Sequence, residues 1–329
     1  MSHKKDKSGK PLSCWIEKER FRGEIVDCLT IILRGKGCRW GRCLMCGFPK
    51  FSIGEEDLRR QIDYAFRMAE KKGSKPEILK IFTSGSFFDD NEIPSSFREY
   101  VYSKVEDEKM KKLIVESRPE FVFSCDAFDR KFELEVGIGL ETSNDEVREL
   151  CVNKGFTFED FSRAAKFLIE CGARVRTYLL LKPPFLSEGE AVEDCLRSIL
   201  ECARLSSTIS VNPVYVPKNS YIEKLWSAGI YRPPWLWSAV EVLKKASEIL
   251  SENYRLGYDI NLICDPVGAG SSRASHNCGK CDRDIADEIR KFSITQKTEF
   301  ERSCECLEFW RKYIRYEKVA RFDVSSVFT

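Results

Sequence analysis

The chain has 329 residues, 43% of them hydrophobic, which is enough for one large core with an appended module. Its 54 basic and 52 acidic side chains leave a net charge of only +2, so the composition excludes a uniformly basic nucleic-acid binder, and any RNA contact must use local patches. Fifteen cysteines occur in a chain with a polar amino-terminal stretch and no apolar run of membrane-spanning length. This composition predicts reduced thiols in a cytoplasmic protein, with neither a membrane nor DNA among its partners.

Strand-like apolar runs alternate with helical patterns along most of the chain. Strands are predicted at residues 25–33, 78–82, 113–117, 134–141, 175–181 and 209–215, and helices at 55–72, 95–110, 144–151, 157–171 and 188–204. Such strand–helix units form parallel sheets, which right-handed crossovers curl. We therefore predict an α/β fold with an open, partial TIM-type barrel of about six strands at residues 25–263. A polar extension at 1–24 precedes it, and a cysteine-rich, metal-binding module at 264–329 follows.

Three cysteines, Cys38, Cys43 and Cys46, follow the first predicted strand in a Cys-x4-Cys-x2-Cys pattern. Three thiolates are one too few for a [4Fe-4S] cluster, so one iron stays open for a small molecule. This is the arrangement of radical S-adenosylmethionine (SAM) enzymes, in which SAM binds the open iron. Their usual spacing is Cys-x3-Cys-x2-Cys, and we expect Gly37 and Gly41 to let the loop absorb the extra residue. A zinc site would need a fourth ligand from elsewhere, and a disulfide would leave one thiol over.

Several polar residues fall at the carboxyl ends of the predicted strands, where such barrels bind their ligands. The turn Ser84-Gly85-Ser86 can expose backbone groups to the SAM amino group, although a plain strand-to-helix turn is the alternative. Glu141 can accept hydrogen bonds from ribose hydroxyls, or it can simply lie beside a helix cap. We assign these residues to SAM binding together with Asn212 after the sixth strand.

Three basic residues accompany these strands. Arg118 follows the third strand, Arg176 lies in the fifth, and Lys182 follows the fifth. Each can pair with a carboxylate or phosphate, while a solvated surface charge is the alternative. We assign Arg176 and Lys182 to cofactor binding and Arg118 to substrate binding.

A second cysteine group consists of Cys278, Cys281, Cys304 and Cys306. Two close pairs separated along the chain are typical of a structural zinc site closed by four thiolates. A second iron–sulfur cluster would use the same ligands.

In these motifs the chain resembles a known family, the archaeal radical SAM proteins of archaeosine biosynthesis (RaSEA, archaeosine synthase subunit beta). The resemblance runs over nearly the whole chain, and its most specific part is Asn-Cys-Gly-Lys-Cys-Asp at residues 277–282 with the later Cys-x-Cys. Further matching stretches lie at residues 33–47, 116–120, 137–155, 212–217 and 264–266. More distantly, the barrel resembles that of the Elongator catalytic subunit.

The resemblance implies a substrate and partners. The substrate would be a tRNA whose D-loop 7-deazaguanine (preQ0) carries a lysine joined through its side-chain nitrogen. ArcS, the archaeosine synthase alpha subunit, would attach that lysine. A 5′-deoxyadenosyl radical formed from SAM would then start cleavage of the lysine C–N bond and leave archaeosine. A ferredoxin- or flavodoxin-type reductant would supply the electron. Two other functions remain open: a radical SAM enzyme acting on another RNA or small molecule, and a zinc-stabilised RNA-binding protein without catalysis.

Overall fold

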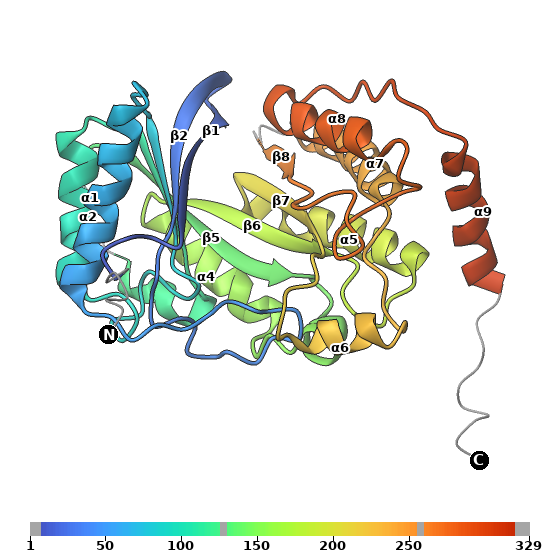
Figure 1. The fold of residues 1–329 in the computed structure, drawn as a ribbon, viewed down its shortest axis with the longest axis horizontal. Helices are drawn as coiled ribbons and strands as arrows, with labels where there is room; N and C mark the ends of the chain where they lie inside the picture. The colour runs from blue at the N-terminus through green and yellow to red at the C-terminus, as the bar shows by residue number, and fades with distance from the viewer. Residues whose placement is uncertain (1–7, 126–129, 255–259, 320–329) are drawn as a thin grey trace, which may run out of the picture.

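The computed structural model describes residues 8–125, 130–254 and 260–319. Within these residues, eight strands form one curled sheet in the order β1-β2-β3-β4-β5-β6-β7-β8 (Figure 1). Their bounds are Ser13–Phe21 (β1), Glu24–Ile32 (β2), Ile78–Phe82 (β3), Lys112–Glu116 (β4), Glu133–Glu141 (β5), Arg174–Leu181 (β6), Thr208–Pro213 (β7) and Asn261–Cys264 (β8). Strands β2 to β8 run parallel, and β1 is antiparallel to β2. The six predicted strands are β2 to β7, and β1 and β8 are additional.

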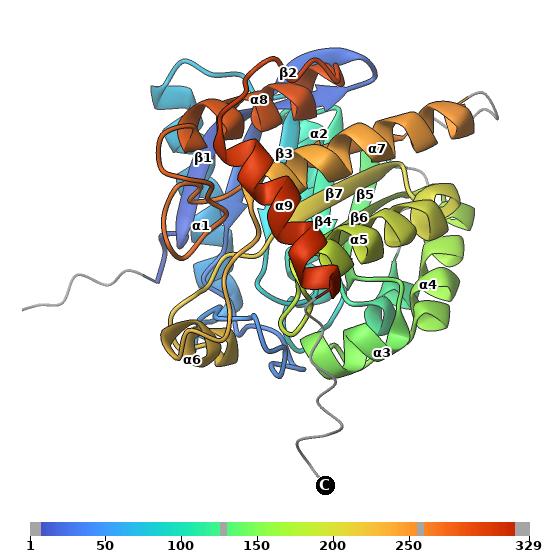
Figure 2. The same ribbon diagram turned by 90° about the vertical axis from the view of Figure 1, so that its right-hand side faces the viewer.

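Most helices cover the outer face of the sheet (Figures 1 and 2). The helices are Glu55–Lys71 (α1), Ser95–Asp107 (α2), Asp145–Val147 (α3), Phe158–Glu170 (α4), Glu188–Cys202 (α5), Tyr221–Ser227 (α6), Leu236–Tyr254 (α7), Asp282–Thr295 (α8) and Cys306–Val319 (α9). Helix α6 lies at the strand ends beside the loop that follows β2. Shorter helical segments are Pro119–Ser124 (η1), Arg148–Val152 (η2) and Ala203–Leu205 (η3). The predicted amphipathic helix is α1, which buries Leu58, Ile62 and Ala65 against the sheet. No helix among the described residues is long and apolar enough to cross a membrane.

Strand β1 lies within the residues predicted as a polar extension. Four charged residues, 17–20, follow one another in this strand, and Glu17 and Glu19 point to the concave face of the sheet, which we call the lumen. There Lys80 of β3 lies 2.8 Å from Glu17 and 2.6 Å from Glu19. These ion pairs explain why a strand with a charged inner face is stable in this position.

Helix α8 lies along the β8 edge of the sheet. Ser293 Oγ accepts the Cys264 N–H at 2.8 Å and donates to the Cys264 carbonyl oxygen at 2.7 Å. The Gln296 side-chain amide makes the same two kinds of bond with the backbone of Leu262, at 3.0 and 2.8 Å. These side chains satisfy backbone groups that an edge strand otherwise leaves unpaired. The carboxyl-terminal module is therefore joined directly to the barrel.

Candidate active site and metal centre

The cysteine loop lies between β2 and α1, at the edge of the sheet where the parallel strands end. The Cys38 N–H donates to the Ser84 carbonyl oxygen at 2.8 Å. A Cβ added to Gly85 would lie 3.1 Å from Cys38 Cα. The structure thus brings the cysteine loop against the Ser84–Ser86 turn that follows β3.

A buried carboxylate, Glu92, joins these two loops and has no local signal in the sequence. Its two oxygens accept the backbone N–H groups of Arg39 in the cysteine loop and Ser86 in the turn. Burial raises the pKa of the Glu92 carboxyl, while the two N–H donors favour its charged form. A Cβ on Gly85 would come within 1.8 Å of Glu92 Oε2, so the contact requires glycine there.

The cysteine loop leaves its three thiol side chains accessible. Cys38, Cys43 and Cys46 are all partly exposed. Gly37 and Gly41 adopt positive φ angles of 76° and 57°, which confirms that these glycines supply the unusual backbone of the longer loop. Within the described part of the chain, the three sulfurs do not form a group that lies within 4.8 Å, as ligands of a single ion would. A four-iron cluster spaces its ligands further apart, because each thiolate binds a different iron.

Three predicted SAM-binding residues have a left-handed backbone at the ends of strands. The φ angles are 60° at Ser84, 70° at Glu141 and 66° at Lys182. Non-glycine residues at such angles are uncommon and cluster at functional sites. The Glu141 carboxylate accepts a hydrogen bond from Lys154 Nζ at 2.6 Å. A Cβ on Gly139 would lie 2.7 Å from each partner, so glycine makes room for this pair.

Arg118 is held beside the cysteine loop. Its guanidinium lies over the rings of Trp40 and Phe156, 5.3 and 5.4 Å from their centroids. It donates to the Glu120 carboxylate and, at 3.0 Å, to the Lys154 carbonyl oxygen. This location at the mouth of the barrel agrees with the one predicted for a substrate-binding cation.

Cys43 lies close to the same cations. Burial raises the pKa of its thiol to about 11, while Lys154 and, more weakly, Arg118 favour the thiolate. A thiol must be deprotonated to bind iron, so both cations favour the state that a metal ligand at this position would need.

Arg176 and Lys182 are buried and do not lie on an open binding surface. The Arg176 guanidinium donates to Glu135 at 2.9 Å and to Glu19 at 2.8 Å, and the residue is only 3% exposed. Lys182 Nζ lies 2.7 Å from Glu188 Oε2, and Glu188 is fully buried. Internal carboxylates neutralise both cations, so this geometry does not support the prediction that they bind SAM.

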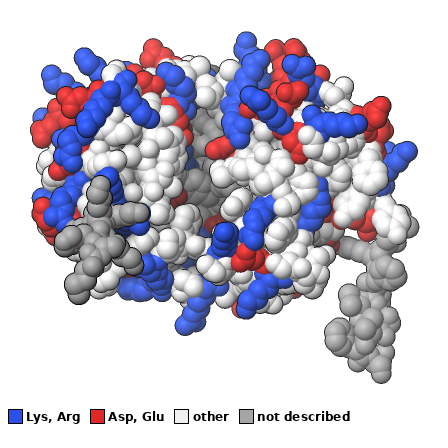
Figure 3. All heavy atoms as spheres, viewed as in Figure 1, with Lys and Arg blue, Asp and Glu red and all other residues white. Residues whose placement is uncertain are grey.

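The lumen next to these strand ends holds two polar side chains that were not assigned from the sequence. Glu116 ends β4 and stands opposite Gly137 of β5 in the strand register. The Tyr178 ring of β6 covers Gly137, where a Cβ would lie 2.6 Å from the ring. Asn212, a predicted SAM-binding residue, lies on β7, and its amide is hydrogen-bonded to Ser210. The space-filling view shows the molecule hollowed at its centre (Figure 3).

The four carboxyl-terminal cysteines form a compact group. Their sulfurs all lie within 4.8 Å of one another, with separations of 3.9 Å for Cys278–Cys281, 3.7 Å for Cys278–Cys304 and 3.6 Å for Cys281–Cys306. A tetrahedral ion with metal–sulfur bonds of about 2.3 Å places its ligands about 3.8 Å apart. The group therefore has the dimensions of a site for one ion and is too tight for ligands of a four-iron cluster.

Side-chain N–H groups surround this site and link it to the barrel. Trp237 Nε1 donates to the Cys306 sulfur at 3.2 Å, and Asn277 Nδ2 donates to the Cys281 sulfur at 3.4 Å. Such bonds stabilise thiolates and orient metal ligands. Helix α9 begins at Cys306 and crosses in front of α5 (Figure 2), and Trp310 Nε1 donates to Ser238 on α7.

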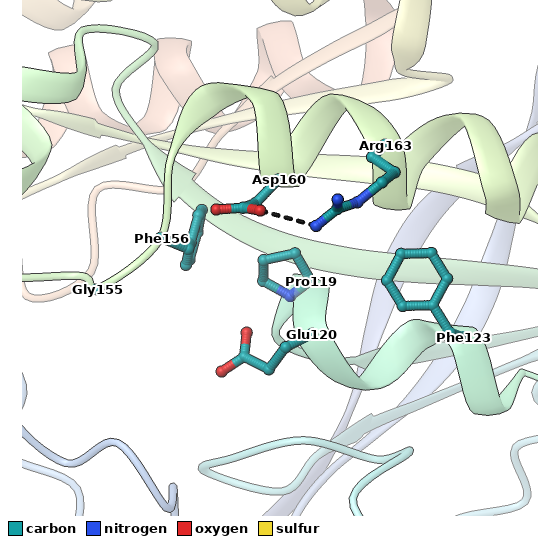
Figure 4. A pocket seen from close by; sticks show the side chains of 7 residues that line it. All are labelled: Pro119, Glu120, Phe123, Gly155, Phe156, Asp160 and Arg163. Carbon is teal, nitrogen blue, oxygen red and sulfur yellow. Dashed lines mark hydrogen bonds and ion pairs between the residues drawn. The ribbon is translucent and has the colours of Figure 1, made fainter.

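A separate cavity of about 240 Å³ lies between η1 and α4 (Figure 4). Its charged lining residues include Asp160 and Arg163, which pair with each other at 2.9 Å. Phe156 lines this cavity and also packs on Arg118. The cavity therefore borders the candidate active site from outside the lumen.

Comparison with known proteins assigns the chain to a family, although no protein-family model matches it. The chain is 40% identical over 326 residues to archaeosine synthase subunit beta of Methanosarcina acetivorans, covering 94% of this chain and 91% of that protein. It is 38% identical over 319 residues to archaeosine synthase subunit beta of Thermococcus kodakarensis, covering 91% and 95%. The chain belongs to the archaeosine synthase subunit beta family.

Among solved structures, the archaeal Elp3 of Methanocaldococcus infernus with an amino-terminal deletion aligns with a TM-score of 0.51 and 15% identity. The alignment covers 72% of this chain and 58% of that one, and the likeness concerns the fold alone. The curled sheet of parallel strands confirms the predicted α/β fold with an open, partial TIM-type barrel.

Proposed function

We propose that this protein is the radical SAM enzyme that completes archaeosine in tRNA by cleaving the C–N bond of a lysine attached to 7-deazaguanine. The observation that carries the proposal is the cysteine loop at the mouth of the curled sheet, in a chain 40% identical to an archaeosine synthase subunit beta. ArcS would supply the lysine-bearing tRNA, and a ferredoxin- or flavodoxin-type protein would supply the electron.

The residues at the mouth of the barrel would have different roles. Cys38, Cys43 and Cys46 would hold a [4Fe-4S] cluster, and the Ser84–Ser86 turn and Glu141 would position SAM. When bound, the cluster and SAM would supply a 5′-deoxyadenosyl radical able to abstract hydrogen from the lysine carbon beside the amidine nitrogen. The chain's own contribution is to place that carbon precisely and to exclude water and other hydrogen donors.

Arg118 is the cation that the geometry supports for the lysine α-carboxylate. Its guanidinium is fixed by the rings of Trp40 and Phe156. Its ion pair is with Glu120, which is exposed to solvent, whereas Arg176 and Lys182 are paired with buried carboxylates. The N–H groups that remain can bind a further carboxylate. This position next to the cysteine loop would keep the amino-acid end of the substrate near the reacting carbon.

We also propose that Cys278, Cys281, Cys304 and Cys306 bind one Zn²⁺. The sulfur separations of 3.6 to 3.9 Å match a tetrahedral ion, and the four ligands leave no open position for catalysis. The ion would fix the segments before α8 and α9 and so hold the module on the barrel.

The decisive experiment uses the anaerobically purified protein with lysine-modified tRNA, SAM and a reductant. Archaeosine and 5′-deoxyadenosine should form together and depend on both SAM and the lysine modification. Formation of 5′-deoxyadenosine without archaeosine would indicate a radical SAM enzyme with another substrate. A colourless protein without iron that still binds tRNA would indicate the non-catalytic alternative.

A further inference from the structure

Glu116 occupies an unusual position in the lumen. Along β4, Ile114 packs with apolar side chains of β1, β2 and β3 on the concave side of the sheet, and Val115 packs in the core under the helices. Because side chains alternate along a strand, Glu116 faces the lumen. The strand register sets it opposite Gly137, and the Tyr178 ring covers that glycine. The Tyr178 hydroxyl is buried and has no hydrogen-bond partner among the described residues. A carboxylate and a phenol therefore face the same space at the end of the barrel where the cysteine loop lies.

This carboxylate has no cation of its own. Among the described residues, no lysine or arginine nitrogen lies within 4.0 Å of Glu116, although other lumen carboxylates are paired. Lys154, the cation that most favours the charged form of Glu116, is paired with Glu141 at 2.6 Å. Burial raises the pKa of the Glu116 carboxyl to about 7. The Glu116 side chain is partly buried. A partly buried carboxylate without a cation partner is costly, and a ligand that brings a positive charge reduces this cost.

We propose that Glu116 and Tyr178 bind the α-ammonium group of the amino acid carried by the substrate. The inference rests on the proposed function, in which a lysine joined through its side-chain nitrogen keeps its α-amine and α-carboxylate free. An α-amino acid presents opposite charges on one carbon. Glu116 faces the lumen and would bind the ammonium, and Arg118, which is held beside the cysteine loop at the same end of the barrel, is the cation proposed for the carboxylate. The positive groups of SAM are the other possible source of the charge, and the test separates the two.

The first arm of the test needs no variant. Three tRNAs are compared in the parent enzyme: one carrying lysine, one carrying 6-aminohexanoate, which lacks only the α-amine, and one carrying cadaverine, which lacks only the α-carboxylate. We expect kcat/KM for archaeosine formation to fall roughly 30-fold or more when the α-amine is missing. Equal turnover of the lysine and 6-aminohexanoate tRNAs would overturn the inference. If no lysine-bearing tRNA is converted, the proposed function fails first.

The second arm assigns the effect to the residues. Glu116→Gln and Tyr178→Phe should lose activity on the lysine tRNA, yet both should match the parent on the 6-aminohexanoate tRNA, where the contact is absent in every protein. SAM affinity and 5′-deoxyadenosine formation without tRNA should stay within about twofold of the parent. Loss of SAM binding in Glu116→Gln would assign the carboxylate to SAM and overturn the inference. Equal losses on the lysine and 6-aminohexanoate tRNAs would also overturn it.

Discussion

The Glu116 carboxyl should make the protein less stable at neutral pH than it would be with an uncharged side chain there. Its pKa in the folded protein is about 7, compared with an ordinary value of 4.5. The folded state therefore holds this proton up to a higher pH than the unfolded state does. Between these two values the unfolded chain binds fewer protons, so stability falls as pH rises through the window. At about 1.4 kcal/mol per pH unit, the gap corresponds to about 3 kcal/mol.

Glu116→Gln imitates the protonated form at every pH and should escape this loss. The free energy of unfolding of the variant should equal that of the parent near pH 4.5 and exceed it by about 3 kcal/mol at pH 8. Urea unfolding followed by tryptophan fluorescence at pH 5, 6, 7 and 8, under anaerobic conditions, measures the difference. Glu248→Gln on the exposed side of α7 is the matched control and should change stability by less than about 0.5 kcal/mol at every pH. A Glu116→Gln protein that is less stable than the parent at pH 8 would refute the reasoning, because the carboxylate would then be making favourable contacts.

Four further outcomes can be measured. Cys43→Ala should keep the fold by circular dichroism but lose iron and form no 5′-deoxyadenosine, and a full iron content would contradict the ligand assignment. Cys281→Ser should lose one zinc per chain and have a lower melting temperature, since structural zinc contributes directly to folding. Additional iron in place of zinc in the parent protein would instead indicate a second iron centre. Glu92→Gln should retain several-fold less iron after reconstitution, because the amide oxygen accepts one backbone N–H while the NH2 group cannot accept the other. Unchanged iron would mean that the two loops hold together without the second bond and the charge. Arg118→Ala should lower kcat/KM on lysine tRNA by roughly 30-fold or more and leave the cadaverine tRNA unaffected, and equal losses on both would exclude a contact with the α-carboxylate.

Most of the barrel could be predicted from the sequence because its strands are short apolar runs between amphipathic helices. Strand β1 could not, since Glu17 and Glu19 on its inner face resemble solvent-exposed charges. Their partners, Lys80 and Arg176, lie on β3 and β6, far along the chain. Strand β8 has only four residues, too few for a pattern to stand out. Both strands therefore depend on tertiary contacts that no local window contains.

Some residues of the candidate site could likewise be predicted from the sequence, and others could not. Both cysteine groups were visible because thiolates at short spacings suit few structures other than metal centres. The roles of Arg176 and Lys182 were not visible, since a position in or after a strand does not reveal whether a carboxylate from another element already neutralises the cation. Glu92 and Lys154 were missed for the complementary reason: each acts on a loop or strand end that is distant in sequence.

The carboxylates of the lumen show how one scaffold can serve both stability and binding. Glu135 is as deeply buried as any side chain in the barrel, yet Arg176, Lys112 and Thr208 outweigh the cost of burial and hold the pKa of its carboxyl at about 2. The Glu135 carboxylate is already paired with cations of the protein, so it is not available to bind a positively charged ligand. Glu116 lies further along the same lumen, and with no paired cation its pKa moves in the opposite direction. A residue that raises the energy of the empty protein persists most readily where a bound partner lowers it again. The opposite pKa shifts of Glu135 and Glu116 therefore separate a carboxylate that stabilises the barrel from the one that we propose for substrate binding.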